Sequence, residues 1–86
     1  MNTQMILEEL LGLLEANGVA IRRERLGGNA GGLCKVKDEW IFFLDTESTS
    51  TESAAHCAEA VLNRVDTEKI YIRPEVREFI NKFGKG

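Results

Sequence analysis

The chain has 86 residues, of which 43% are hydrophobic, so it can form one folded domain over residues 1–86 but not two separate cores. Its net charge is −3, from 11 basic and 14 acidic residues, and it lacks the basic excess typical of nucleic-acid binders. No apolar run is as long as a membrane span, so neither a nucleic acid nor a membrane is the expected partner.

The first residues favour a cytoplasmic location. They contain no early Lys or Arg and carry acidic residues instead, unlike a secretory signal. In a reducing compartment Cys34 and Cys57 are expected to be free thiols, because a disulfide is disfavoured there.

Apolar residues at helical spacing predict a first helix over residues 3–16. Asn2 or Thr3 can cap its start, and Asn17-Gly18 supplies the left-handed residue that often ends a helix. The apolar stripe is broad, so this helix is expected to contact both a sheet and another element.

Three strands are predicted next. Residues 19–26, V-A-I-R-R-E-R-L, have β-branched side chains at the start and charged ones toward the end, which is typical of an edge strand. Residues 33–37 alternate in polarity, and a tight turn at Asp38-Glu39 leads into residues 40–44. This last run, W-I-F-F-L, is apolar on both faces and predicts a central strand that is covered on both sides.

The second half of the chain predicts two helices separated by a fourth strand. Thr49 and Glu52 form a capping box before a long amphipathic segment. Residues 69–73, K-I-Y-I-R, have the composition of a strand. Pro74 then stands at the first position of a last helix, which ends near Gly84.

These elements predict an α/β fold in the order α-β-β-β-α-β-α, with a mixed four-stranded sheet in two or three layers. Short links favour an antiparallel meander for the first three strands. The connection through the second helix has the length of a right-handed crossover, which would make the third and fourth strands parallel.

The stretch L-G-G-N-A-G-G-L-C at residues 26–34 is the most unusual segment. Glycines can expose backbone N–H groups that bind an anion, and arginines stand just before them. The known phosphate loops open a helix, whereas this one leads to a strand, so a wide turn with positive φ angles is the other interpretation. The candidate ligand-binding residues are Arg22, Arg23, Arg25, Gly27, Gly28, Asn29, Gly31, Gly32 and Asp45.

No catalytic residue, metal site or cofactor is predicted. His56 is the only histidine, and with Glu52 and Glu59 it would chelate a metal only weakly, so a solvated helix face is the simpler interpretation. Asp45 lacks a second acid or a base for a catalytic pair and can instead cap a loop. An enzyme that uses Cys34 or Cys57 is a third, weaker hypothesis.

The apolar content suggests a partner surface. Three short helices either cover both faces of the sheet or leave one apolar face open, and an open face on such a protein usually marks an interface. The sequence therefore predicts a non-enzymatic module that forms a homodimer or binds another protein. Small-ligand or anion binding by the glycine-rich stretch is the alternative.

The motifs G-G-N-A-G-G-L-C, I-F-F-L-D and I-R-P-E-V-R together resemble those of a family of short, uncharacterised bacterial proteins. The resemblance spans residues 5–83 and implies a cytoplasmic bacterial domain without an assigned catalytic residue. Residues 32–65 are also distantly similar to the core of ImmA/IrrE-type zinc peptidases. That family needs H-E-x-x-H, and this chain has H-C-A-E-A, so the similarity implies a lost zinc site.

Overall fold

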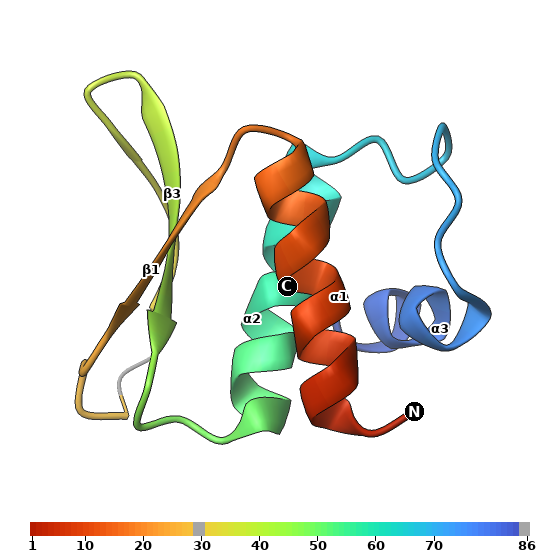
Figure 1. Cartoon of the computed structure of the whole chain (residues 1–86), viewed down its shortest axis with the longest axis horizontal. Helices are drawn as coiled ribbons and strands as arrows, with labels where there is room; N and C mark the ends of the chain where they lie inside the picture. Colours follow the sequence, from red (N-terminus) through yellow and green to blue (C-terminus); the bar gives the residue numbers. More distant parts are fainter. Residues whose placement is uncertain (29–30, 85–86) are drawn as a thin grey trace.

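A computed structural model describes residues 1–28 and 31–84 (Figure 1). It is an α/β fold with three helices and a three-stranded mixed sheet, in the order α-β-β-β-α-α. The elements are α1 (Thr3–Ala16), β1 (Ala20–Glu24), β2 (Gly32–Val36), β3 (Glu39–Asp45), α2 (Ser50–Arg64) and α3 (Pro74–Phe83).

The predicted helix starts are confirmed. The Asn2 side chain accepts a hydrogen bond from the backbone N–H of Met5 at 2.9 Å at the start of α1. Thr49 and Glu52 form the capping box of α2, in which each side chain bonds the other residue's backbone N–H. Pro74 opens α3, where its missing N–H costs no helical hydrogen bond.

The strand order is β1-β3-β2, so β3 is central as predicted. β1 runs parallel to β3, and β2 runs antiparallel to it. The predicted antiparallel meander is therefore wrong. β1 pairs with β3 along its length, and Thr46 N–H extends this pairing with a bond to the Glu24 carbonyl at 2.9 Å, so β2 lies on the other edge of β3.

β2 and β3 are joined by a two-residue hairpin at Lys37 and Asp38. Both residues have positive φ angles, 50° and 68°, as the turn matched to strand twist requires. Glu39 is already paired with Val36, so the turn lies one residue earlier than the predicted Asp38-Glu39.

The molecule has three layers (Figure 1). The sheet forms one outer layer, α1 and α2 form the middle layer, and α3 packs on their far side. Phe42 and Leu44 of β3 are buried against the middle layer, and Val76 and Ile80 of α3 are buried on its other side. Both faces of the α1–α2 layer are therefore covered, as the broad apolar stripe of α1 predicts.

The predicted fourth strand is wrong, and with it the parallel crossover to that strand. Residues 69–73 form no strand and lie on the side of α1 and α2 that is remote from the sheet (Figure 1). Ile72 is 6% exposed and fills the core there, whereas Tyr71 is 82% exposed. The β-branched composition serves to anchor this connection to the helices rather than to extend the sheet.

Within the described residues, no helix is long and apolar enough to cross a membrane.

Candidate functional site

Asp45 joins the two loops at the carboxyl end of the sheet. Its Oδ1 atom accepts the backbone N–H of Leu26 at 3.0 Å and that of Glu47 at 2.9 Å. Its Oδ2 atom accepts the Ser48 hydroxyl at 3.2 Å. The Asp45 side chain thus ties the glycine-rich loop after β1 to the loop that leads into α2.

The charge of Asp45 is stabilised by these donors. The N–H of Glu47 contributes most, and the N–H groups of Leu26 and Gly28 and the Ser48 hydroxyl add to it. Together they outweigh the cost of burial and hold the pKa of Asp45 below its ordinary value. Asp45 is a carboxylate that caps backbone donors, one of the two roles considered for it from the sequence.

Glu47 binds the same loop at the next residue along the chain. Its carboxylate accepts the N–H of Gly27 at 3.0 Å and lies 3.7 Å from the Arg25 guanidinium. Two N–H groups at the start of the glycine-rich stretch therefore already have carboxylate partners within the chain. The carboxylates of Asp45 and Glu47 thus take the place that an external anion would occupy at these N–H groups.

Arg22 and Arg23 lie on opposite faces of β1. Arg22 forms an ion pair with Glu24 at 2.8 Å, and its guanidinium carbon lies 5.9 Å from the centre of the Phe43 ring. Arg23 is level with Leu44 and faces the helices, where it lines a cavity together with Asp45. The three predicted arginines therefore do not form one cluster: Arg22 is paired with Glu24, Arg25 lies near Glu47, and Arg23 lines a cavity.

The glycines of the predicted site occupy different structural positions. Gly27 and Gly28 have φ angles of 72° and 79°, in the left-handed region. Gly31 approaches β3 so closely that a Cβ atom would overlap the Phe43 carbonyl oxygen. Gly32 begins β2 opposite Phe43, and Asn29 lies outside the described residues.

The outer surface of the sheet is not covered by a helix (Figure 1). We call this surface the open face. Along each strand, residues of the open face alternate with residues that face the helices. The expectation that β3 is covered on both sides is therefore wrong. The open face is formed by Ala20, Arg22, Glu24, Gly32, Cys34, Val36, Glu39, Ile41 and Phe43.

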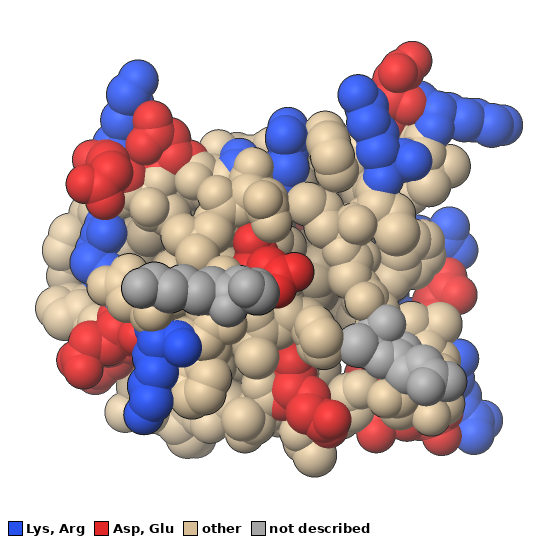
Figure 2. Space-filling view, turned by 180° about the vertical axis from the view of Figure 1, so that it is seen from behind, with Lys and Arg blue, Asp and Glu red and all other residues tan. Residues whose placement is uncertain are grey.

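The open face is mostly apolar and accessible. Val36 is 44% exposed, Ala20 and Cys34 are exposed, and Ile41 and Phe43 are half-buried. Charged side chains elsewhere are dispersed: seen from behind, Lys and Arg are scattered around the rim of the molecule and form no continuous patch on the side shown in Figure 2.

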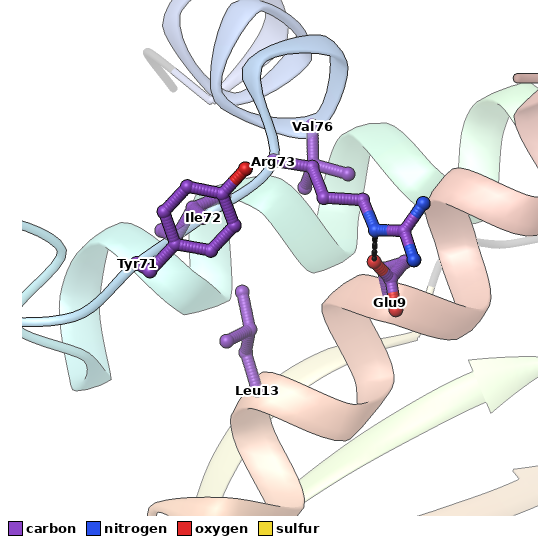
Figure 3. Close-up of a pocket in the computed structure, with 6 residues that line it drawn as sticks. All are labelled: Glu9, Leu13, Tyr71, Ile72, Arg73 and Val76. Atoms are coloured by element: carbon purple, nitrogen blue, oxygen red, sulfur yellow. Dashed lines mark ion pairs between the residues drawn. The ribbon is translucent and has the colours of Figure 1, made fainter.

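Two cavities lie beside the middle helical layer. One, of about 330 Å³, lies between α1 and the segment before α3, where Tyr71 and Leu13 face each other and Arg73 pairs with Glu9 at 3.0 Å (Figure 3). Another, of about 370 Å³, lies between the sheet and α2 and includes His56 and Trp40. The Trp40 ring carries the Arg64 guanidinium 4.3 Å from its centre.

The two thiols lie in different surroundings. Burial raises the pKa of Cys57 to about 12, so this thiol stays protonated, while Cys34 is exposed on the open face. Among residues 1–28 and 31–84, no three His, Cys, Asp or Glu side chains cluster as metal ligands do.

Arg23 and Asp45 belong to one predicted site with the glycines, and the structure brings these two residues to one cavity that the described glycines do not line. The parallel pairing of β1 and β3 would have pointed to this cavity, because ligands gather beyond the carboxyl ends of parallel strands. The stacking of Arg64 on Trp40 was also missed, because the two residues are far apart in sequence.

No family model matches the chain, and neither the curated proteins nor the solved structures contain a match to it.

Proposed function

We propose that this protein is a non-enzymatic interaction module that associates with a second copy of itself through the open face. The observation that carries the proposal is the alternation along β3. Phe42 and Leu44 are buried under the helices, whereas Ile41 and Phe43 are equally apolar and have no helix above them. Apolar surface of this kind is stabilised when a partner removes it from water.

The charges of the open face favour a like partner. Arg22 is the cation of this face, and Glu24 on the same strand already neutralises it at 2.8 Å. Glu39 is exposed at the hairpin end of this face, opposite Val36. Two copies that meet through Cys34, Ile41 and Phe43 therefore leave Glu39 in water and bury no unpaired charge, which would be costly. Pairing of one surface with its own copy is also the commonest form of symmetry in protein oligomers.

The size of the face predicts weak association. β1 and β2 have five residues each and β3 has seven. The three strands therefore cover roughly 14 by 17–23 Å, from about 4.8 Å between strands and about 3.3 Å per residue. A standard stable interface buries about 800 Å² on each partner, which is well above this footprint. We expect a dissociation constant in the micromolar range or weaker.

Sedimentation velocity over a wide range of protein concentration tests the proposal. The sedimentation coefficient of the natural sequence should rise with concentration. Val36→Lys places a charge on the open face and should keep the protein monomeric. Met5→Lys is the matched control, because Met5 is 51% exposed, lies on α1 and should leave association unchanged.

A strict monomer at high concentration would contradict self-association. Equal loss of association in both variants would also contradict it, since the open face would then have no special role. Circular dichroism of each variant confirms that the fold is retained.

Anion binding by the glycine-rich loop is the second candidate, and the internal bonds of Leu26 and Gly27 to Asp45 and Glu47 weigh against it. Titration with inorganic phosphate, followed by the backbone amide resonances of Gly27, Gly28, Gly31 and Gly32, decides this point. Saturable shifts there would favour anion binding by the loop.

A further inference from the structure

A third cavity, of about 260 Å³, lies beyond the carboxyl ends of β1 and β3. Its walls come from four elements: the first turns of α1, the ends of the parallel strands, the loop after β3 and the start of α2. Its lining residues are Gln4, Leu7, Glu8, Arg23, Leu44, Asp45, Thr46, Ser48, Ser50 and Ser53. Pockets that bind drug-sized ligands have volumes of roughly 300–1,000 Å³, so an occupant of this cavity is small.

Three hydroxyl groups of this cavity already donate their protons within the chain. Ser50 Oγ donates to Gln4 Oε1 at 2.7 Å, and Ser48 Oγ donates to Asp45 Oδ2 at 3.2 Å. Thr46 Oγ1 donates to the Glu24 carbonyl at 3.5 Å. A hydroxyl has one proton to donate, so these three oxygens remain for the ligand only as acceptors.

Two carboxylates add further acceptors. Glu8 uses one oxygen to accept the Gln4 amide at 2.9 Å. Asp45 is 4% exposed and is already bonded to two backbone N–H groups and to Ser48. The lining of the cavity is therefore rich in acceptors and contains two carboxylates.

Arg23 supplies the opposite charge. Within residues 1–28 and 31–84, Arg22 and Arg25 have ion-pair partners at 2.8 and 3.7 Å, whereas Arg23 has none. Its five N–H donors thus remain available, and a guanidinium matches the geometry of a carboxylate.

Ser53 is a second available donor. The residue is 6% exposed, and its hydroxyl forms no side-chain hydrogen bond with the described part of the chain. No fully buried polar side-chain atom in that part lacks a partner, so the Ser53 hydroxyl retains contact with the cavity. The chain thus leaves this hydroxyl to water or to a ligand, and it can donate one hydrogen bond to an occupant of the cavity.

We propose that this cavity binds a small molecule that combines one carboxylate with amino or hydroxyl donors, the chemistry of a free amino acid or a small hydroxy acid. Arg23 and Ser53 bind the carboxylate, and Glu8 with the hydroxyl oxygens accepts from the donors. Leu7 and Leu44 contact the aliphatic part. The site lies on the helix-facing side of the sheet and does not depend on self-association.

The test uses backbone amide chemical shifts of the whole chain at a concentration where it is monomeric. The probes are a mixture of free amino acids and a set of small hydroxy acids. Acetate and methylamine serve as probes that carry only one of the two groups. Saturable shifts of Leu44, Ser50 and Ser53 are expected with the two-group probes and not with acetate or methylamine.

Arg23→Gln should weaken binding by about tenfold or more, because it removes the charge that meets the carboxylate. Arg22→Gln is the matched control, since Arg22 precedes Arg23 and lies on the opposite face of β1. Ser53→Ala tests the buried hydroxyl, and its own spectrum shows whether the fold is retained.

Three results would overturn the proposal. One is the absence of saturable shifts with every probe at millimolar concentration. Another is equal binding of acetate, which would remove the need for donors. The third is an equal effect of Arg22→Gln and Arg23→Gln, which would show that the response does not arise at this cavity.

Discussion

The two faces of the sheet have nearly the same composition along β3 but opposite surroundings. Phe42 and Leu44 are almost fully buried against α1 and α2, whereas Ile41 and Phe43 alternate with them and belong to the open face. Apolar residues alone therefore do not show which face forms the core. The number of helices available to cover the sheet decides it, because α3 packs on the far side of α1 and α2.

The largest effect should come from adjacent phenylalanines on the two faces. Phe42 is 1% exposed, and Phe42→Ala should lower the free energy of unfolding by about 3–5 kcal/mol. Phe43 is half-buried, and Phe43→Ala should cost roughly 1–2 kcal/mol. Urea unfolding of the two variants measures the difference, and equal losses would show that both faces are covered.

A substitution at Gly31 tests how closely the chain approaches the central strand. Gly31→Ala should lower the free energy of unfolding by roughly 1–3 kcal/mol, because the new Cβ atom would lie 2.7 Å from the Phe43 carbonyl carbon. Gly12→Ala is the control on α1, where nothing lies within 4 Å, and it should raise stability by about 0.5–1 kcal/mol. A neutral Gly31→Ala in urea unfolding would contradict the close approach.

The pH dependence of stability tests the carboxylate that links the two loops. The pKa of Asp45 is lowered from 3.8 in the folded protein, chiefly by the N–H of Glu47. A lowered folded pKa adds stability above about pH 4, and this contribution is lost as the pH falls through the folded value.

The urea concentration at the midpoint of unfolding should decrease from neutral to acidic pH, and this decrease should be smaller in Asp45→Asn. Asp38→Asn, in the exposed hairpin turn, should leave the pH profile close to that of the natural sequence. Identical profiles for the natural sequence and Asp45→Asn would show that Asp45 does not carry this charge-dependent bond.

Local patterns predicted the individual elements well. The first helix has the predicted bounds of residues 3–16, and the capping box and Pro74 start their helices as expected. These features depend on neighbours within one turn, which the sequence contains directly.

Features that depend on distant parts of the chain were less predictable. The strand-like residues 69–73 anchor to the helices through Ile72 because the chain leaves α2 on the side away from the sheet. The meander prediction was wrong because β1 pairs in parallel with β3, a contact between segments about twenty residues apart that the short connections do not reveal. Arg23 was predicted as a site residue, but its cavity depends on the parallel pairing of β1 with β3, which local patterns do not encode.

The alkylation rate of Cys34 at increasing protein concentration tests self-association through the open face most directly. Cys34 is exposed on that face, and the buried Cys57, with its pKa raised to about 12, is an unreactive internal control. The rate constant of Cys34 should fall as concentration rises, and Val36→Lys should abolish the fall. A Cys34 rate constant that is independent of concentration, up to the highest attainable, would contradict the account.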